Sequence, residues 1–188
     1  MKLRKLLTVV MTLVGALVAG MVAPSPAFAY DNGPWEIFDY SADWMCMEVA
    51  GASTQNSAQV QIWDCGSFYN VTPLHQRWIF RNTTNGYYRL VNGNSGKCAN
   101  IKGSTDANST KIIQYICGTS DLTLNDQWYP DPSFSTGGHD WYRLRSRLNY
   151  GKCLNVQGNG TSAGTDLILY TCGSGANNFF SWRPATQV

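Results

Sequence analysis

Charged residues and histidines are scarce in this sequence. Asp, Glu, Lys and Arg make up only 14% of the 188 residues, and His75 and His139 are the two histidines. No Gly-x-Ser-x-Gly, His-Glu-x-x-His or phosphate-loop motif occurs. We therefore expect a protein that is not an enzyme and that carries no metal and no cofactor. A glycosidase that relies on two carboxylates stays open, although Glu36 and Glu48 are the only glutamates.

Long apolar runs are also missing, except near the amino terminus. Lys2, Arg4 and Lys5 precede an almost wholly apolar stretch, residues 6–23, and small residues follow it. This order is typical of a secretory signal peptide, here residues 1–29. An uncleaved membrane anchor is the alternative, because a run of this length just spans a bilayer. We favour cleavage, because prolines follow the run and no basic stop sequence does. We therefore expect a secreted, extracellular protein without membrane insertion.

The chain has no excess of basic residues once that signal is set aside. Three of its 14 Lys and Arg lie within residues 1–29, so 11 remain against 12 Asp and Glu, a net charge of −1. A nucleic-acid-binding protein needs a basic stripe, and the sequence has none. We therefore expect no nucleic-acid partner. The remaining residues, 30–188, have the length of one domain.

What the sequence does contain is six cysteines in a regular pattern. They form three pairs, and the two members of each pair are 19 residues apart every time. Many pairings of six cysteines are conceivable, but the equal spacing favours one disulfide within each pair, in an oxidising compartment. The pairs begin 52 and 55 residues apart, which indicates three repeats, at about residues 35–82, 83–134 and 135–188. The predicted disulfides join Cys46 to Cys65, Cys98 to Cys117, and Cys153 to Cys172.

The residues around the cysteines repeat as well. In each copy a polar residue follows the first cysteine by two positions, a β-branched residue by three and a glycine by five. An aromatic residue lies two positions before the second cysteine. Alternation that ends in glycine is typical of a strand that runs into a turn. About four short strands per copy predict an all-β protein, in which three copies close into a barrel without free edges.

A tryptophan near the end of each copy completes a family resemblance. The first copy closes with Gln76-Arg77-Trp78, the second with Asp126-Gln127-Trp128, and the third with Phe179-Phe180-Ser181-Trp182. With the cysteine spacing and the aromatic residues, this pattern resembles the ricin B-type lectin domain, also called carbohydrate-binding module family 13. The resemblance implies a β-trefoil of three pseudo-equivalent repeats over residues 30–188. Because large aromatic side chains dominate small cores, we expect the three tryptophans to be buried.

The resemblance further implies three shallow sugar sites, one per repeat. In the family an aspartate two residues after the first cysteine accepts hydrogen bonds from sugar hydroxyls, an aromatic platform stacks on the sugar ring, and an asparagine before the closing motif adds a bond. The neutral amides found here in two copies form weaker bonds than a carboxylate. In copies one, two and three, the position of the family's aspartate holds Glu48, Asn100 and Asn155. The platforms are Trp63, Tyr115 and Tyr170. The asparagine position holds His75, Asn125 and Phe179, and Gln76 follows His75.

Two functions therefore compete. A non-catalytic lectin that binds a glycan or polysaccharide follows from the resemblance and from the three platforms. A scaffold for a non-covalent protein partner, as in a toxin accessory or an inhibitor, follows from the altered acid in all three copies, because a fold keeps its core after its sites are lost. We favour the lectin.

Overall fold

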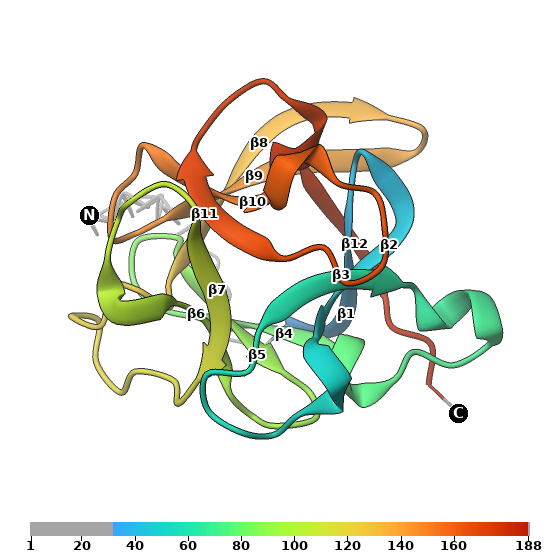
Figure 1. Cartoon of the computed structure of the whole chain (residues 1–188), viewed down its shortest axis with the longest axis horizontal. Coiled ribbons are helices and arrows are strands. Elements are labelled where there is room, and N and C mark those ends of the chain that lie inside the picture. The colour runs from blue at the N-terminus through green and yellow to red at the C-terminus, as the bar shows by residue number, and fades with distance from the viewer. Residues whose placement is uncertain (1–31, 188) are drawn as a thin grey trace, which may run out of the picture.

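The computed structural model describes residues 32–187, which form strands and short 3-10 helices (Figure 1). The predicted signal peptide, residues 1–29, lies outside the described residues. Within residues 32–187 no helix is long and apolar enough to cross a membrane. The strands are β1 (Asn32–Asp39), β2 (Ala42–Val49), β3 (Val60–Asp64), β4 (Trp78–Asn82), β5 (Tyr88–Asn92), β6 (Cys98–Ile101), β7 (Thr110–Tyr115), β8 (Trp128–Thr136), β9 (His139–Ser146), β10 (Lys152–Val156), β11 (Leu167–Thr171) and β12 (Phe180–Pro184). The 3-10 helices are η1 (Ala50–Ala52), η2 (Gly66–Tyr69), η3 (Leu74–Gln76), η4 (Lys102–Ser104), η5 (Gln157–Asn159) and η6 (Ala176–Asn178).

Six of the strands close into a barrel. β1 pairs with β4 and β12, β5 pairs with β4 and β8, and β9 pairs with β8 and β12. The ring is therefore complete and leaves no edge strand open to pairing with another chain. Each repeat supplies its first and fourth strand to this barrel, and a short strand before each first cysteine is where the sequence predicts one.

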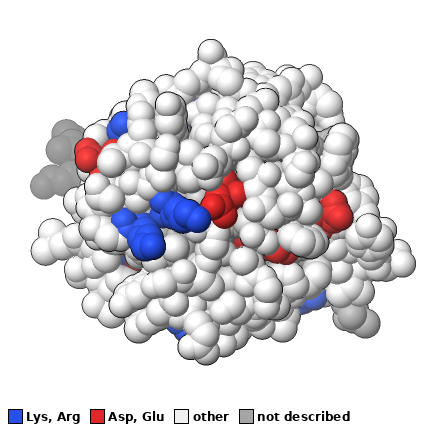
Figure 2. Space-filling view, viewed as in Figure 1, with Lys and Arg blue, Asp and Glu red and all other residues white. Residues whose placement is uncertain are grey.

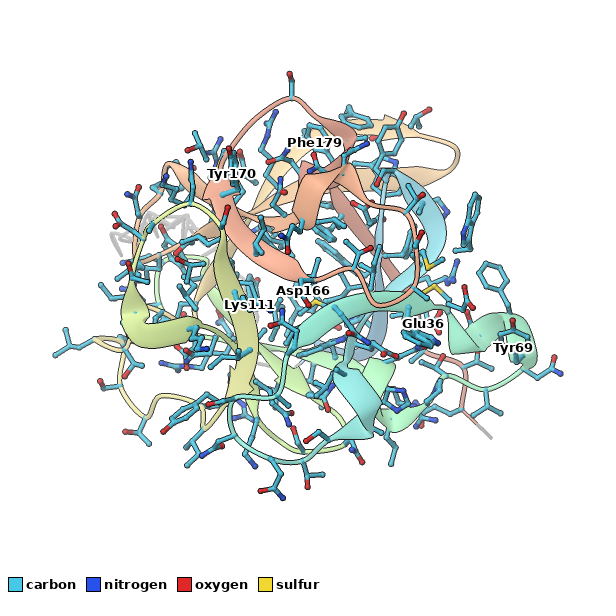
Figure 3. All side chains as sticks on the ribbon, viewed as in Figure 1. Glu36, Tyr69, Lys111, Asp166, Tyr170 and Phe179 are labelled. Atoms are coloured by element: carbon cyan, nitrogen blue, oxygen red, sulfur yellow. A yellow bond between two sulfur atoms is a disulfide. The ribbon has the colours of Figure 1, made fainter. Side chains whose placement is uncertain are left out.

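The other six strands form three hairpins over one end of the barrel. They are β2–β3, β6–β7 and β10–β11, one from each repeat. The hairpins also touch one another, since β11 pairs with β7 and Gln61 forms a bridge with Asp166. Lys111 Nζ on β7 lies 2.8 Å from Asp166 Oδ2 just before β11 (Figure 3). Barrel and hairpins together are a β-trefoil, as the sequence predicts.

The closing tryptophans of the first two repeats lie in the core. Trp78 and Trp128 are fully buried at the starts of β4 and β8. Each indole Nε1–H donates to a backbone carbonyl, that of Met47 at 2.8 Å and that of Ala99 at 3.1 Å. Both side chains thus fill the barrel interior while their polar N–H group is satisfied.

The third repeat corrects the prediction made for Trp182. β12 begins at Phe180, which is fully buried and pairs with Asp39, just as Trp78 pairs with Asn92 at the start of β4. Phe180 therefore occupies the core position of the closing tryptophan. Trp182, two residues further along the strand, is only partly buried and stacks on Tyr142 with ring centroids 4.5 Å apart. The cause is a shorter loop, because Phe180 lies 8 positions after Cys172, whereas Trp78 and Trp128 lie 13 and 11 positions after their cysteines.

All three disulfides form within their repeats, which confirms the predicted pairing. The bonds join Cys46 to Cys65, Cys98 to Cys117 and Cys153 to Cys172. Each bond ties the first strand of a capping hairpin to a cysteine one or two residues past the end of the second strand. A loop of this size contributes about 3 kcal/mol on the chain-entropy account.

One hairpin breaks the threefold symmetry. From Trp78 to Asn92, β4 and β5 with their turn take 15 residues, whereas from Trp128 to Ser146, β8 and β9 take 19. The longer hairpin turns at Gly137 and Gly138, both with positive φ, as a tight two-residue hairpin turn requires. Its tip reaches beyond the barrel toward β2 (Figure 1).

Candidate functional site

Three aromatic side chains take the same position in the three capping hairpins. They are the predicted platforms, and their exposed fractions are nearly equal at 44%, 42% and 42%. Side chains at opposite positions of an antiparallel pair share one face of the sheet. The opposite residue is in each case a buried cysteine, and each aromatic side chain stays partly exposed. The opposed pairs are Trp63 with Cys46, Tyr115 with Cys98, and Tyr170 with Cys153.

The first repeat surrounds its platform with a pocket of about 570 Å³. Glu48 lines this pocket although its side chain is almost fully buried. Gln61 lies opposite Glu48 across the β2–β3 pair, and Gln61 Nε2 donates to Glu48 Oε1 at 3.0 Å. The pocket thus combines the apolar ring of Trp63 with a carboxylate held in place from one side. Tyr69, at the end of η2, adds a second exposed aromatic ring to the lining (Figure 3).

His75 and Gln76 hold the same carboxylate from the other side. Nε2 of His75 lies 3.3 Å from Glu48 Oε2, and Nε2 of Gln76 donates to that oxygen at 3.1 Å. Gln76 also donates to the carbonyl of Asp64 and accepts from the N–H of Gly66, which fixes its amide group. The four residues that the sequence assigns to the first site therefore lie together. A carboxylate has about four lone-pair positions, so Glu48 keeps capacity for one more donor.

The third repeat also forms a pocket, of about 500 Å³. The pockets of the first and third repeats are called the first pocket and the third pocket below. Tyr170 and Asn155 line it, as the sequence predicts. Asn177 lines it too, and its Nδ2 donates to Asn155 Oδ1 at 3.0 Å and to the carbonyl of Val156 at 2.8 Å. Asn155 is thereby held with one acceptor position used, and its own amide N–H groups remain as donors.

Asn177, and not Phe179, occupies the asparagine position of the third repeat. The prediction of Phe179 was wrong because it counted back from Trp182, whereas the repeat closes at Phe180. Asn178 then stands where Gln76 stands in the first repeat, and its Oδ1 accepts from the N–H of Gly173 at 3.2 Å. Phe179 instead packs beneath the guanidinium group of Arg143, 4.6 Å from the ring centroid.

The second repeat brings its predicted residues together in the same way. Asn125 Nδ2 donates to Asn100 Oδ1 at 2.8 Å, the counterpart of the Asn177–Asn155 bond. Asp126 replaces the glutamine of the closing motif, and its Oδ2 accepts from the N–H of Gly118 at 2.7 Å. The same oxygen forms an ion pair with Arg89 at 3.0 Å. The second repeat therefore keeps the asparagine pair, with Asn100 on the same hairpin as Tyr115.

The three sites consequently offer different hydrogen-bonding groups beside similar rings. The first presents a carboxylate, which only accepts, and the second and third present amides, which both donate and accept. The sequence reasoning missed four residues that complete these sites. Gln61 was detectable, because isoleucine stands at the matching positions of the other two repeats. The missed residues are Gln61, Tyr69, Asn177 and Asn178.

Comparison with known proteins agrees with this geometry. A model for ricin-type beta-trefoil lectin domain-like sequences matches residues 29–115 and 74–170. Nigrin b of Sambucus nigra is 25% identical over 97 residues, which are 52% of this chain and only 14% of nigrin b. The chain thus matches a small part of that relative's length.

Solved structures of the same shape include a designed protein and a fungal lectin. ThreeFoil, a designed threefold symmetric protein, superposes with a TM-score of 0.69 at 26% identity, covering 80% of this chain and 98% of ThreeFoil. The ricin B-like lectin of Macrolepiota procera, solved in complex with lactose, gives 0.64 at 17% identity, covering 82% and 97%. The second likeness shows the fold alone. Since the family model spans most of the chain, this protein belongs to the ricin-type β-trefoil lectin domain-like family.

Proposed function

We propose that this protein is a secreted, non-catalytic lectin that binds glycans through its first and third repeats. The observation that carries the proposal is the half-exposed aromatic ring set beside a buried, hydrogen-bonded polar group in each pocket. A sugar ring has an apolar face and a rim of hydroxyls, so it matches such a pair. A site for an anionic ligand would instead gather Lys or Arg, and neither pocket has one among its lining residues.

The charge distribution argues against an anionic ligand. Acidic and basic side chains are few and mixed in sign on the face that carries the capping hairpins (Figure 2). In the first pocket, Glu48 and Asp64 are the charged lining residues, and the third pocket has none among its lining residues. Glycans with terminal galactose, and xylan, are the ligands to examine first. The lactose complex of the Macrolepiota procera lectin makes galactose the more direct choice.

The platforms provide the first test. We expect Trp63→Ala to weaken glycan binding at the first pocket at least tenfold, about 1.4 kcal/mol, because the sugar loses its stacking surface. Tyr170→Ala should do the same at the third pocket. A glycan array would identify the ligand, and isothermal titration of each variant would measure the loss.

Tyr150→Ala is the matched control. Tyr150 is as exposed as the platforms but lies outside both pockets, so its replacement should leave the affinity unchanged. An array without signal at millimolar sensitivity would contradict the lectin proposal, as would equal affinities for all three variants.

A protein scaffold is the second candidate, and one observation favours it. Glu48, Asn100 and Asn155 each already have hydrogen bonds from neighbouring side chains, so their site is stable without a sugar. The test is to capture a protein partner from the source's secretions. A complex that free sugar does not dissociate, and that the Trp63→Ala variant still forms, would favour the scaffold.

A further inference from the structure

The long β8–β9 hairpin creates a pocket that has no place in the threefold pattern. This seam pocket has a volume of about 460 Å³ and lies where the end of the first barrel strand meets the tip of the hairpin. Its lining residues come from the first and third repeats. Its lining residues belong to none of the three family sites. They include Tyr40, Ser41, Trp44, Thr136, His139 and Trp141.

An aromatic residue at position 40 is peculiar to this seam. The N–H of Tyr40 donates to the carbonyl of Phe179 at 2.9 Å. Gly93 and Arg147 make the corresponding bonds, to Arg77 and Gln127, at the other two seams. The three positions are therefore equivalent in the fold, yet one of them carries an exposed ring beside the extended hairpin.

The rings that wall the seam pocket are fixed before any ligand arrives. Trp141 is almost fully buried and meets Tyr40 edge to face, with centroids 4.8 Å apart. Phe134 contacts Tyr40 from the other strand of the hairpin at 5.2 Å, and Phe38 contacts Trp141 at 5.4 Å. Edge-to-face pairs of this kind hold each ring in one orientation. A rigid wall loses little freedom when it binds a ligand.

Trp44 completes the pocket with an open ring. Its side chain is 53% exposed, more than any of the three platforms. Its backbone carbonyl accepts from the N–H of Cys65 at 2.8 Å, so the main chain beneath the ring is anchored. An indole offers a large apolar face and one N–H donor. It is therefore placed like a platform, although it precedes the first cysteine instead of the second.

The lining identifies the class of ligand. It contains no Lys, Arg, Asp or Glu, and its polar groups are the hydroxyls of Tyr40 and Thr136, Ser41 Oγ and the imidazole of His139. The hydroxyl of Ser41 donates to Asp39, which leaves its oxygen as an acceptor. A neutral ligand with an apolar face and several hydroxyls fits rings and groups of this kind. We propose that the seam pocket is a fourth glycan-binding site, a claim that rests on the proposed lectin function.

The strand that carries Trp44 also carries the first repeat site. Trp44 and Glu48 are four residues apart on β2, and Trp44 lies in the stretch where the register between β1 and β2 shifts. The separation along the strand is roughly 13 Å at about 3.3 Å per residue. The seam pocket therefore adds a subsite for a glycan of several units, which gains affinity by engaging both.

The test uses the full mature chain and the sugar that binds best on an array of galactose-terminated and xylan-derived oligosaccharides. One variant removes the three platforms together, by Trp63→Ala, Tyr115→Ala and Tyr170→Ala. We expect it to retain measurable binding in isothermal titration and to lose that remainder, at least tenfold, when Trp44→Ala is added. Trp44→Phe, which keeps a ring, should retain it. The indole N–H signal of Trp44 should shift in the nuclear magnetic resonance spectrum during the titration.

The outcomes separate this inference from the lectin proposal. If the wild-type chain binds a glycan, while the triple variant binds none and the Trp44 signal stays fixed, the seam pocket is not a sugar site. The lectin proposal then stands. If the wild-type chain binds no glycan at all, both fail. Because Trp44 is largely exposed, its replacement leaves the core intact, and circular dichroism should show an unchanged fold.

Discussion

At the scale of single residues, Asp39 is the most unusual group in the structure. It occupies the place that Asn92 and Ser146 take at the other two seams, opposite the residue that begins the fourth strand. Asn92 uses its amide to donate to the carbonyl of His75 at 2.9 Å. Asp39 accepts from Ser41 through Oδ1, but its Oδ2 is buried without a hydrogen-bond partner in the described part of the chain. Burial raises the pKa of Asp39 to about 7, against the lowering effect of Ser41.

This raised pKa predicts a loss of stability with rising pH. Below the usual value of 3.8, Asp39 is protonated in both the folded and the unfolded chain, and the stability is full. As the pH rises toward 7, the unfolded chain releases the proton and the folded chain keeps it, so the free energy of unfolding falls, by roughly 4 kcal/mol at most. We expect Asp39→Asn to remove this dependence and to be more stable than wild type at pH 8. Urea unfolding between pH 4 and pH 8 measures both, and parallel curves for the two proteins would refute the assignment.

At the scale of elements, the fourth strands show which chemistry the core requires. The closing residue of each repeat must be large and apolar, but an indole is not obligatory, because Phe180 fills the position in the third repeat. The strand start is therefore set by packing inside the barrel and not by a fixed motif. Trp182 shows the converse. Because the preceding loop is shorter, this tryptophan lies two residues past the core position of Phe180 and is only partly buried.

Replacing Trp128 with Phe tests this view of the core. The change keeps an aromatic ring but removes the donor to the Ala99 carbonyl, which would stay buried and unpaired. We expect a loss of about 1–3 kcal/mol in the free energy of unfolding, measured by urea denaturation. Trp182→Phe is the control, because Trp182 is only partly buried, and its cost should be clearly smaller. Equal costs for the two variants would show that neither the burial of the indole nor its hydrogen bond sets the cost.

At the scale of the whole molecule, the closed barrel and three disulfides hold the pockets on one rigid body. Sites fixed in this way can engage a multivalent glycan together, and modest affinities then multiply. We expect binding to a surface dense in the ligand to exceed binding to the free monosaccharide by on the order of 100-fold. Surface plasmon resonance compared with isothermal titration measures the ratio.

Loss of one pocket provides the control for that prediction. Trp63→Ala should reduce binding to the dense surface far more than it reduces the affinity of the third pocket for free sugar. A variant that loses the same factor in both measurements would show that the pockets act independently.

Much of this protein was predictable from local sequence. The equal spacing of the cysteines favoured one disulfide within each repeat, and the structure confirms that pairing. The platforms followed from the family resemblance, and in the structure each lies opposite the first cysteine of its pair. Period-two alternation determined the strands and, through them, the threefold barrel.

Only the tertiary structure decided the features that depend on loop length and on contacts between repeats. In the third repeat the core position falls on Phe180 and the site asparagine is Asn177. The loop after Cys172 is shorter, so the residues before Trp182 pair with β1 at other positions than the sequence pattern indicates. Asp39 and the seam pocket arise where the first repeat packs on the third, more than 90 residues away along the chain. Residues that far apart along the chain leave no repeating pattern in the sequence. The burial and raised pKa of Asp39, and the shared pocket, therefore arise only when the barrel closes.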